Sequence, residues 1–310
     1  MAGWQFWIDR GGTFTDIVAR APDGRLLTCK KLSENPGHGE DAAIAGIREL
    51  LGLAPGAPIP AADIAAVKMG TAVATNALLE RTGAPTLLVV NRGLADVLRI
   101  GTQARPRLFD LHVRLPPMLY ARVIEVAGRL DAAGTEIAPL DEAAALAAFR
   151  AAHAEGLAAC AIVLMHAWKH PAHEQRLAAL ARAAGFTQVS TSHQTSPLLR
   201  LVPRGDTTVA DAYLSPVLHR YVHRVAAALP GVPLFFMQSH GGLAKAEAFH
   251  GKDAVLSGPA GGLVGAARSA AAAGHERLIA FDMGGTSTDV ALYAGRLERS
   301  TETEIAGVRL

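Results

Sequence analysis

One eight-residue pattern occurs twice in this chain of 310 residues, as DRGGTFTD at 9–16 and as DMGGTSTD at 282–289. Six of the eight positions are identical, and each copy lies between two short apolar runs. An apolar run, a Gly-Gly turn and a second apolar run predict a strand, a tight turn and a strand. The sequence therefore predicts two similar hairpins near its opposite ends.

The residue types in these turns suit a phosphate. A Gly-Gly pair allows close backbone approach, so consecutive N–H groups can converge on an anion, and threonine hydroxyls add further donors. The residues expected to contact a nucleotide are Arg10, Gly11, Gly12, Thr13, Thr15, Gly284, Gly285, Thr286 and Thr288.

Each pattern begins and ends with aspartate. A carboxylate next to phosphate is repelled unless a cation intervenes, and Mg²⁺ is the cation that carboxylates and phosphates commonly share. We expect Asp9 and Asp282 to position Mg²⁺ or its waters, and Asp16 and Asp289 to orient the loops or the metal shell. Two ordinary hairpin turns are the alternative, but the duplication disfavours it. The two copies of the pattern together predict a binding site for ATP with Mg²⁺.

The duplicated pattern resembles the phosphate loops of the actin, Hsp70 and sugar-kinase superfamily, and other segments resemble the hydantoinase A/5-oxoprolinase family. The segments are 7–16, 30–36, 69–81, 100–111, 203–214, 237–243, 255–265 and 281–290. Arg10 and the stretch 100–109 are more similar to ATP-dependent 5-oxoprolinase than to N-methylhydantoinase. Departures from the family pattern include Ala72, Asn91-Arg92 and His240.

Strand and helix patterns alternate along the chain, which is typical of an α/β fold. Strands are expected at 4–8, 13–20, 25–31, 65–69, 86–91, 158–165, 187–190, 233–238 and 253–257, and helices at 38–51, 71–81, 141–155, 172–184, 206–229 and 261–273. Pro216 predicts a kink or break in the long helix. The resemblance implies an actin-like, ribonuclease H-like fold with mixed sheets. We expect an N-terminal domain over 1–200 and the beginning of a second, incomplete domain over 201–310.

Polar residues in one apolar setting suggest a substrate site. Thr71 and Thr75 share a helix face and Asn76 follows, while Arg105 could clamp a carboxylate in a bidentate fork. The resemblance favours a cleft-lining role for the first three. An N-cap at Thr71, an outward-facing Asn76 and a surface salt bridge at Arg105 are the structural alternatives.

The resemblance implies a reaction in which ATP phosphorylates a lactam oxygen, so that water can open a ring that amide resonance protects. The implied substrate is 5-oxo-L-proline and the product L-glutamate. The resemblance also implies a partner, either a hydantoinase B-type subunit or a C-terminal half. The alternatives are an N-methylhydantoinase, the ATP-using subunit of a ketone carboxylase, and a catalytically incomplete module that only binds a partner.

Composition excludes several other classes. A net charge of +2 without a basic block gives no reason to expect nucleic acid, and a Walker A loop is absent. Apolar runs are too short to cross a bilayer, so we expect a cytoplasmic enzyme. Cys29 and Cys160 read as small buried side chains. The histidines at 166, 170 and 173 raise a zinc hypothesis, with capping and surface polarity as the favoured alternative.

Overall fold

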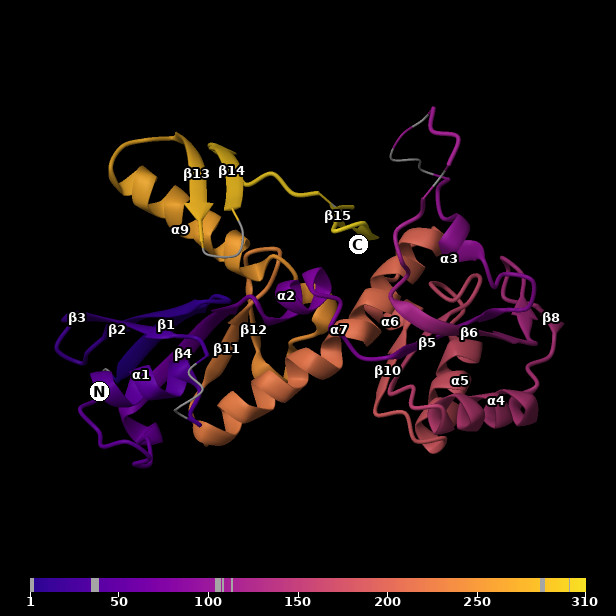
Figure 1. Ribbon diagram of the computed structural model, residues 1–310, viewed down its shortest axis with the longest axis horizontal. Coiled ribbons are helices and arrows are strands. Elements are labelled where there is room, and N and C mark those ends of the chain that lie inside the picture. The colour runs from indigo at the N-terminus through magenta and orange to yellow at the C-terminus, as the bar shows by residue number, and fades with distance from the viewer. Residues whose placement is uncertain are drawn as a thin grey trace. The chain divides into compact units, whose positions relative to one another are not determined.

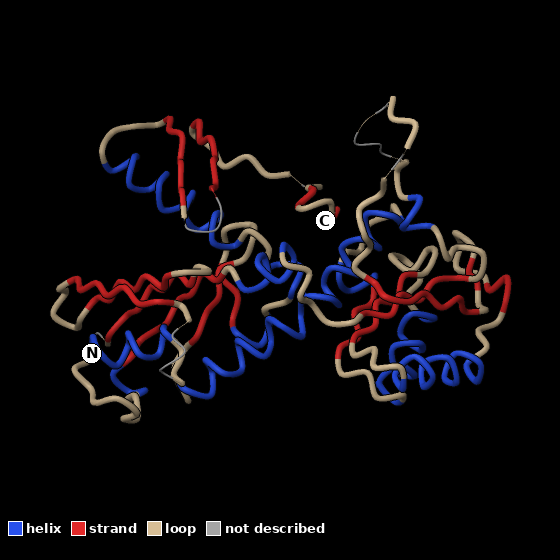
Figure 2. The backbone as a smooth tube through the Cα atoms, in the orientation of Figure 1, coloured by secondary structure: helices blue, strands red, loops and turns tan. Residues whose placement is uncertain are grey.

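The computed structural model describes residues 3–34, 39–103, 107, 109–112, 114–284, 288–300 and 302–310. These residues form two compact units: unit 1 comprises Met1–Asn76 and Leu218–Ser300, and unit 2 comprises Ala77–Val217 and Thr301–Leu310. Figures 1 and 2 show the elements of each. The predicted α/β class is confirmed. The units are defined by which residues pack together, and each contains two separate stretches of the chain. The domain boundary that the sequence suggests at residue 200 is a different kind of division and stays a prediction.

Unit 1 is built on a six-stranded mixed sheet with the order β12-β11-β4-β1-β2-β3. β1 lies inside it, antiparallel to β2 and parallel to β4. The strands are β1 (Trp4–Arg10), β2 (Phe14–Arg20), β3 (Leu26–Leu32), β4 (Ile64–Thr71), β11 (Leu234–Met237) and β12 (Leu243–Lys245). The first three strands lie where the sequence predicted them, and Phe6 and Ile8 of β1 are turned to the core.

One helix covers the first hairpin. α1 (Ala42–Leu50) begins at Asp41, whose side chain accepts from the Ala43 N–H, and it packs on β1, β2 and β3. Gly46 lies near the middle of α1 and faces the sheet, and a Cβ at this position would lie 2.0 Å from Ile17 Cδ1. The absence of a side chain at this position therefore sets how closely α1 approaches the sheet.

A second hairpin and a helix complete unit 1. α9 (Ser257–Ala272) packs on one side of the antiparallel pair β13 (Arg277–Met283) and β14 (Thr288–Ala294), as Figure 1 shows. Among the described residues this sheet has two strands. The remaining short elements are η1 (Ala61–Asp63), η2 (Ala246–Ala248) and α8 (Gly251–Ala254).

Unit 2 has a parallel sheet with the order β10-β9-β5-β6. Every residue of β5 and β9 is buried, as expected when both faces of a parallel sheet are covered. Helices α4 and α5 pack on the sheet, and Phe149, Leu177 and Phe186 belong to the core between them. Its elements are β5 (Thr86–Asn91), α3 (Val97–Ile100), β6 (Tyr120–Val126), β7 (Arg129–Leu130), β8 (Glu136–Ala138), α4 (Glu142–Ala154), β9 (Ala159–Val163), α5 (Ala172–Ala183), β10 (Gln188–Thr191), α6 (Ser192–Thr195), β15 (Glu304–Ile305) and β16 (Val308–Arg309). Two helices belong to both units: α2 (Val73–Leu79) passes from unit 1 to unit 2 after Asn76, and α7 (Leu201–Ala228) passes from unit 2 to unit 1 after Val217.

Two expectations differ from the structure. Of the kink or break expected at Pro216, the break does not occur: α7 is continuous from Leu201 to Ala228, because a row of buried side chains along it outweighs one lost backbone bond, and the kink stays a prediction. The strand expected at 253–257 is wrong. α8 ends at Ala254, Leu256 is left-handed with φ 58°, and α9 begins at Ser257, so the Gly-rich segment forms the first turns of a helix that tolerates Pro259 there.

Both cysteines are free and buried, as predicted. Within the described part of the chain, no helix combines the length and the apolar character needed to cross a membrane.

Candidate functional site: the first phosphate turn and its carboxylates

The first Gly-Gly turn is held in place by the end of β3. The Gly11 N–H donates to Phe14 O across the turn at 3.0 Å. Ser33 donates its hydroxyl to Gly11 O at 2.7 Å and its N–H to Thr13 O at 2.9 Å. Gly12 and Thr13 remain exposed at the tip. The turn is thus fixed from behind and open in front, as an anion-binding loop requires.

Two of the predicted carboxylates lie next to each other. Asp9 and Asp16 are directly paired across β1 and β2, so their side chains leave the same face of the sheet. Lys30 Nζ lies 2.8 Å from Asp16 Oδ1. Gly70 is the partner of Asp9 on β4, and a Cβ there would stand 3.1 Å from Asp9 Oδ1. The missing side chain at Gly70 leaves room for the Asp9 carboxylate.

The pKa of Asp9 is raised above its usual value. Loss of hydration around the carboxyl is the largest cause, and the charges of Asp16 and Asp282 add to it, while Lys30 opposes them. The residue as a whole still reaches solvent. Asp282 belongs to the second hairpin, so the carboxylates of both patterns act on one another within unit 1. Crowded carboxylates that repel each other are a group that a divalent cation would stabilise.

The N-terminus of α9 approaches the same carboxylate. A Cβ at Gly258 would lie 3.9 Å from Asp9 Oδ1. Two bonds fix this end of the helix: the Leu256 N–H donates to Thr75 Oγ1 at 3.0 Å, and Ser257 donates to Thr71 O at 3.2 Å. The first turn of a 16-residue helix presents unpaired N–H groups and a positive dipole end. Beside Asp9 there is thus a second set of donors that suits phosphate.

Arg10 and Thr15 lie on the other face of the hairpin. The Arg10 guanidinium stacks over the ring of Tyr221 at 4.8 Å, and its Nε lies 3.8 Å from Asp41 Oδ2. Thr15 is buried, and its hydroxyl is 3.0 Å from that of Ser33. These two side chains contact other protein groups and hold the hairpin on the face opposite Asp9. We therefore expect them to affect nucleotide binding by fixing the position of the turn.

The second hairpin repeats the carboxylate pair. Asp282 and Asp289 are directly opposite each other on β13 and β14. Gly284 and Thr288 are exposed. Gly285 and Thr286, which the sequence assigns to phosphate contacts, lie outside the described residues.

The residues predicted for the substrate have structural partners. Thr71 is fully buried and accepts from the Val73 N–H at 3.2 Å, at the start of α2, while Thr75 accepts from Leu256 as above. The Asn76 N–H donates to Ala72 O within the helix. Thr71 is the last residue of β4 and only Thr75 lies on α2, so the two do not share a helix face as expected; they join β4 and α2 to α9 close to Asp9. Arg105 lies outside the described residues.

Among the described residues, no group of three or more His, Cys, Asp or Glu side chains is arranged to hold a metal ion. A metal site formed by protein ligands alone is therefore not found in this part of the chain. The carboxylates around Asp9 nevertheless fit Mg²⁺, which usually takes one or two carboxylates and completes its shell with water and phosphate oxygens. His170 and His173 point to separate partners, Ala132 O and Glu136.

Comparison with known protein families decides the relationship. Residues 5–185 match the hydantoinase/oxoprolinase N-terminal region, and residues 204–310 match the hydantoinase/oxoprolinase domain that follows. The chain belongs to the hydantoinase/oxoprolinase family.

Similar proteins of the family are considerably longer. The chain is 43% identical to 5-oxoprolinase 1 of Arabidopsis thaliana over 98% of its own residues, which is 26% of that protein. It matches an ATP-dependent caprolactamase structure from Pseudomonas jessenii with a TM-score of 0.79 and 33% identity, over 97% of this chain and 45% of that one. A nucleotide-free acetone carboxylase gives a TM-score of 0.85 at 25% identity, over 99% and 46%. These matches confirm the predicted actin-like ATPase fold.

Sequence reasoning missed a buried ionic network in unit 2. Glu174 and Arg204 are both fully buried. Glu174 accepts from the Leu164 N–H, the Ser192 hydroxyl and His193 Nδ1, the last at 2.7 Å. Arg204 donates to Ser192 Oγ at 2.9 Å and to Leu164 O at 2.7 Å. The network ties α5 and α7 to the ends of β9 and β10. Because the residues are scattered through the sequence, no spacing revealed it.

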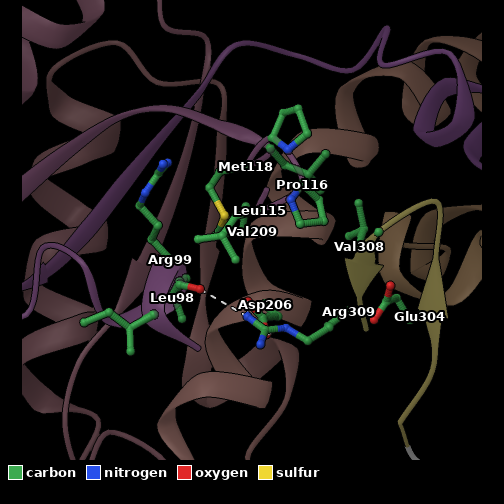
Figure 3. Close-up of a pocket in the computed structure, with 14 residues that line it drawn as sticks. Leu98, Arg99, Leu115, Pro116, Met118, Asp206, Val209, Glu304, Val308 and Arg309 are labelled. Atoms are coloured by element: carbon green, nitrogen blue, oxygen red, sulfur yellow. Dashed lines mark hydrogen bonds and ion pairs between the residues drawn. The ribbon is translucent and has the colours of Figure 1, made fainter. Parts of the chain in front are cut away.

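A cavity of about 280 Å³ in unit 2 was missed as well. It contains the ion pair between Asp206 on α7 and Arg309 on β16, with Asp206 Oδ2 3.0 Å from Arg309 Nε (Figure 3). Burial raises the pKa of Asp206 to about 6, although Arg309 lowers it. The signal in the sequence was an aspartate within the apolar pattern of a long helix, which needs a partner or a ligand when it is buried.

Proposed function

We propose that this chain is the nucleotide-binding part of an ATP-dependent enzyme that opens a cyclic amide, with 5-oxo-L-proline as the substrate and L-glutamate as the product. One observation carries the proposal: Asp9 lies among carboxylates from both Gly-Gly-Thr patterns, in front of a braced turn and at the N-terminus of α9. The similarity to a plant 5-oxoprolinase supports the choice of substrate.

We assign phosphate binding to backbone groups and metal binding to carboxylates. Backbone N–H groups of Gly12 and Thr13 and of the first turn of α9 would bind the β- and γ-phosphates, while the Gly11 N–H closes the turn on Phe14 O. Mg²⁺, held by Asp9 and Asp282, would neutralise charge on the transferred phosphoryl group. Asp16, which Lys30 pairs, would hold the turn and a water of the metal shell. This arrangement would position a phosphoryl group for attack by the lactam oxygen, and positioning with charge stabilisation is the main catalytic contribution in such transfers.

Nucleotide binding by the chain tests the proposal. Isothermal titration with Mg·ATP should show binding that Asp9→Asn and Asp282→Asn each weaken about tenfold or more, because each removes a metal-binding charge. Asp23→Asn is the matched control, since Asp23 is an exposed residue of the turn after β2 and pairs with Arg25. Heat-silent titration at millimolar Mg·ATP, or equal losses in the control, would contradict the proposal and favour a module that only binds a partner.

The overall reaction needs the longer protein, because the chain spans about a quarter of the plant relative. We propose that a hydantoinase B-type subunit or a C-terminal half completes ring opening, and that the isolated chain turns over weakly or not at all. Conversion of oxoproline to glutamate by the purified chain alone would contradict this.

The match to acetone carboxylase supports a second candidate, the ATP-using subunit of a ketone carboxylase, and N-methylhydantoinase is a third. Comparing ATP hydrolysis by the full-length protein with oxoproline, a hydantoin and a ketone separates the three. We expect the largest stimulation with oxoproline.

A further inference from the structure

The residue before the first Gly-Gly turn contacts the long helix α7. Arg10 is the last residue of β1, and its guanidinium carbon lies 4.8 Å from the centroid of the Tyr221 ring. Tyr221 is 3% exposed and belongs to the part of α7 that lies in unit 1. A second guanidinium, that of Arg224, lies 5.6 Å from the same centroid. The ring therefore contacts two cations, and one of them belongs to the residue from which the turn starts.

One carboxylate accompanies the two cations. The Asp41 side chain is 4% exposed, and its Oδ1 accepts from the Ala43 N–H at 3.0 Å, which caps α1. Its Oδ2 lies 3.8 Å from Arg10 Nε and 3.8 Å from Arg224 Nη2, which is longer than a direct hydrogen bond. Asp41 therefore attracts both guanidiniums to this place without fixing their orientation.

The ring face is what orients the Arg10 side chain. Arg10 Nε is buried and has no hydrogen-bond partner among the described residues, and the same holds for the Tyr221 hydroxyl. A guanidinium without a bidentate partner can turn about several bonds, whereas stacking on an aromatic face restricts its plane. The contact thus depends on the face of the Tyr221 ring and not on the hydroxyl.

The backbone of Arg10 connects this contact to the turn. Arg10 is paired with Thr15 on β2 and with Thr71 on β4, and its carbonyl accepts from the Ala72 N–H at 3.0 Å. Gly11, the next residue, begins the turn and has no side chain that could hold it. The direction in which the chain enters the turn is therefore fixed by Arg10, together with the bonds from Ser33 described above.

We propose that Tyr221 is a positioning residue for ATP at the first turn, and that the face of its ring acts on the turn through the Arg10 guanidinium. The N–H groups of the turn must converge on one anion, so a small change in their direction weakens phosphate binding. This inference rests on the proposed function for the identity of the ligand.

The second copy of the pattern lacks the cation for such a contact. Met283 stands at the position of Arg10, and it is 73% exposed. The contact with Tyr221 is therefore a property of the first turn, which lies in the better-packed hairpin.

The test compares variants that keep the ring with variants that lose it. Tyr221→Phe keeps the ring face, so its Kd for Mg·ATP in isothermal titration should stay within about twofold of that of the unaltered chain. Tyr221→Leu removes the ring and should raise the Kd about fivefold or more. A Tyr221→Phe variant that binds as weakly as Tyr221→Leu would overturn the proposal, because the hydroxyl would then be the group that matters.

A matched control separates positioning from a general loss of stability. Phe249 is fully buried in unit 1 and stacks on Phe236 of β11, with the ring centroids 5.1 Å apart. Phe249→Leu removes a ring of similar size from the same unit. It should lower the thermal unfolding temperature as Tyr221→Leu does, but leave the Kd for Mg·ATP within about twofold. Equal increases in Kd for the two leucine variants would overturn the proposal.

A double-mutant cycle tests whether Arg10 carries the effect. Arg10→Met removes the stacked cation, so Tyr221→Leu should raise the Kd by no more than about twofold further in that background. A further fivefold increase would show that Tyr221 acts by another route and would overturn the proposal.

Failure of this inference and failure of the proposed function give different results. If the unaltered chain binds Mg·ATP and Tyr221→Leu binds it equally well, Tyr221 does not position the turn and the proposed function stands. If the unaltered chain does not bind Mg·ATP, the proposed function fails, and hydrogen exchange tests the positioning. The Gly11 N–H, which donates to Phe14 O, should then exchange about fivefold or more faster in Tyr221→Leu than in Phe249→Leu, and equal rates would overturn the inference.

Discussion

The two Gly-Gly-Thr hairpins have nearly the same turn sequence and very different surroundings. In the first, the core-facing side chains of β1 and β2 are 0–3% exposed, and in the second the equivalent side chains are 63–70% exposed. The first set is Phe6, Ile8, Ile17 and Ala19, and the second is Ile279, Phe281, Val290 and Leu292. The first hairpin has α1 and neighbouring strands on both edges. The turn pattern thus encodes the hairpin, while the surrounding chain determines how firmly the hairpin is held.

The largest expected contrast is between a charge in the covered face and one in the open face. Ile17→Asp should cost unit 1 about 4 kcal/mol or more, because it buries an unpaired carboxylate. The equivalent change in the second hairpin, Val290→Asp, should stay within about 0.5 kcal/mol, since that side chain is exposed. Urea unfolding followed by circular dichroism measures both, and similar losses would show that the second face is covered.

The next contrast concerns the close approach of α1. Gly46→Val should cost about 1–3 kcal/mol, because a Cβ there meets the buried Ile17 side chain. Gly262→Val on α9 is the control, since no atom lies within 4 Å of its Cβ position. The same unfolding experiment measures the two changes. A neutral Gly46→Val would mean that α1 can move away from the sheet at little cost.

Exchanging residues between the two copies sharpens the comparison further. Arg10→Met, which introduces the residue of the second copy, should cost about 1–2 kcal/mol, because the stacking on Tyr221 is lost and, of the two arginines described beside Asp41, Arg224 alone remains. The reverse exchange, Met283→Arg, places a cation on an exposed position and should be neutral. Thermal unfolding of the two variants gives the comparison, and a larger effect for Met283→Arg would contradict it.

The smallest effect is expected at the open side of the first hairpin. Lys30→Met removes the ion pair with Asp16, whose two side chains are 57% and 55% exposed, so the free energy of unfolding should fall by no more than about 0.5 kcal/mol. Measurements at low and high salt check the assignment. A loss above 2 kcal/mol would show that this pair is far less hydrated than the structure indicates.

The hairpins and much of the alternating α/β order could be predicted because local patterns encode them. The apolar runs that became β1 and β2 and the Gly-Gly turn between them suffice for the hairpin. The same local reasoning failed at Val255 and Leu256, where an apolar pair suggested a strand. A left-handed Leu256 and the helix beginning at Ser257 depend instead on bonds to Thr71 and Thr75, which are distant in the sequence.

The candidate site divides in the same way. Asp9 and Asp16 could be predicted to lie together, because a two-strand hairpin pairs them directly. The bracing of the turn by Ser33 and the room left by Gly70 depend on strands that join only in the folded sheet. Asp206 and Arg309 are separated by most of the second family domain, so neither a motif nor a period links them.

The interior position of β1 has a consequence for the backbone protons beside Asp9. β1 is hydrogen-bonded to β4 on one edge and to β2 on the other, whereas β13 is paired along one edge among the described residues. In deuterated solvent, amides in the middle of β1 should exchange only when unit 1 opens as a whole, and the outward amides of β13 should exchange by local opening. In this chain, Asp9 therefore lies on a strand whose amides are expected to exchange slowly, whereas Asp282, the other aspartate of the proposed ion site, lies on a strand whose amides are expected to exchange rapidly.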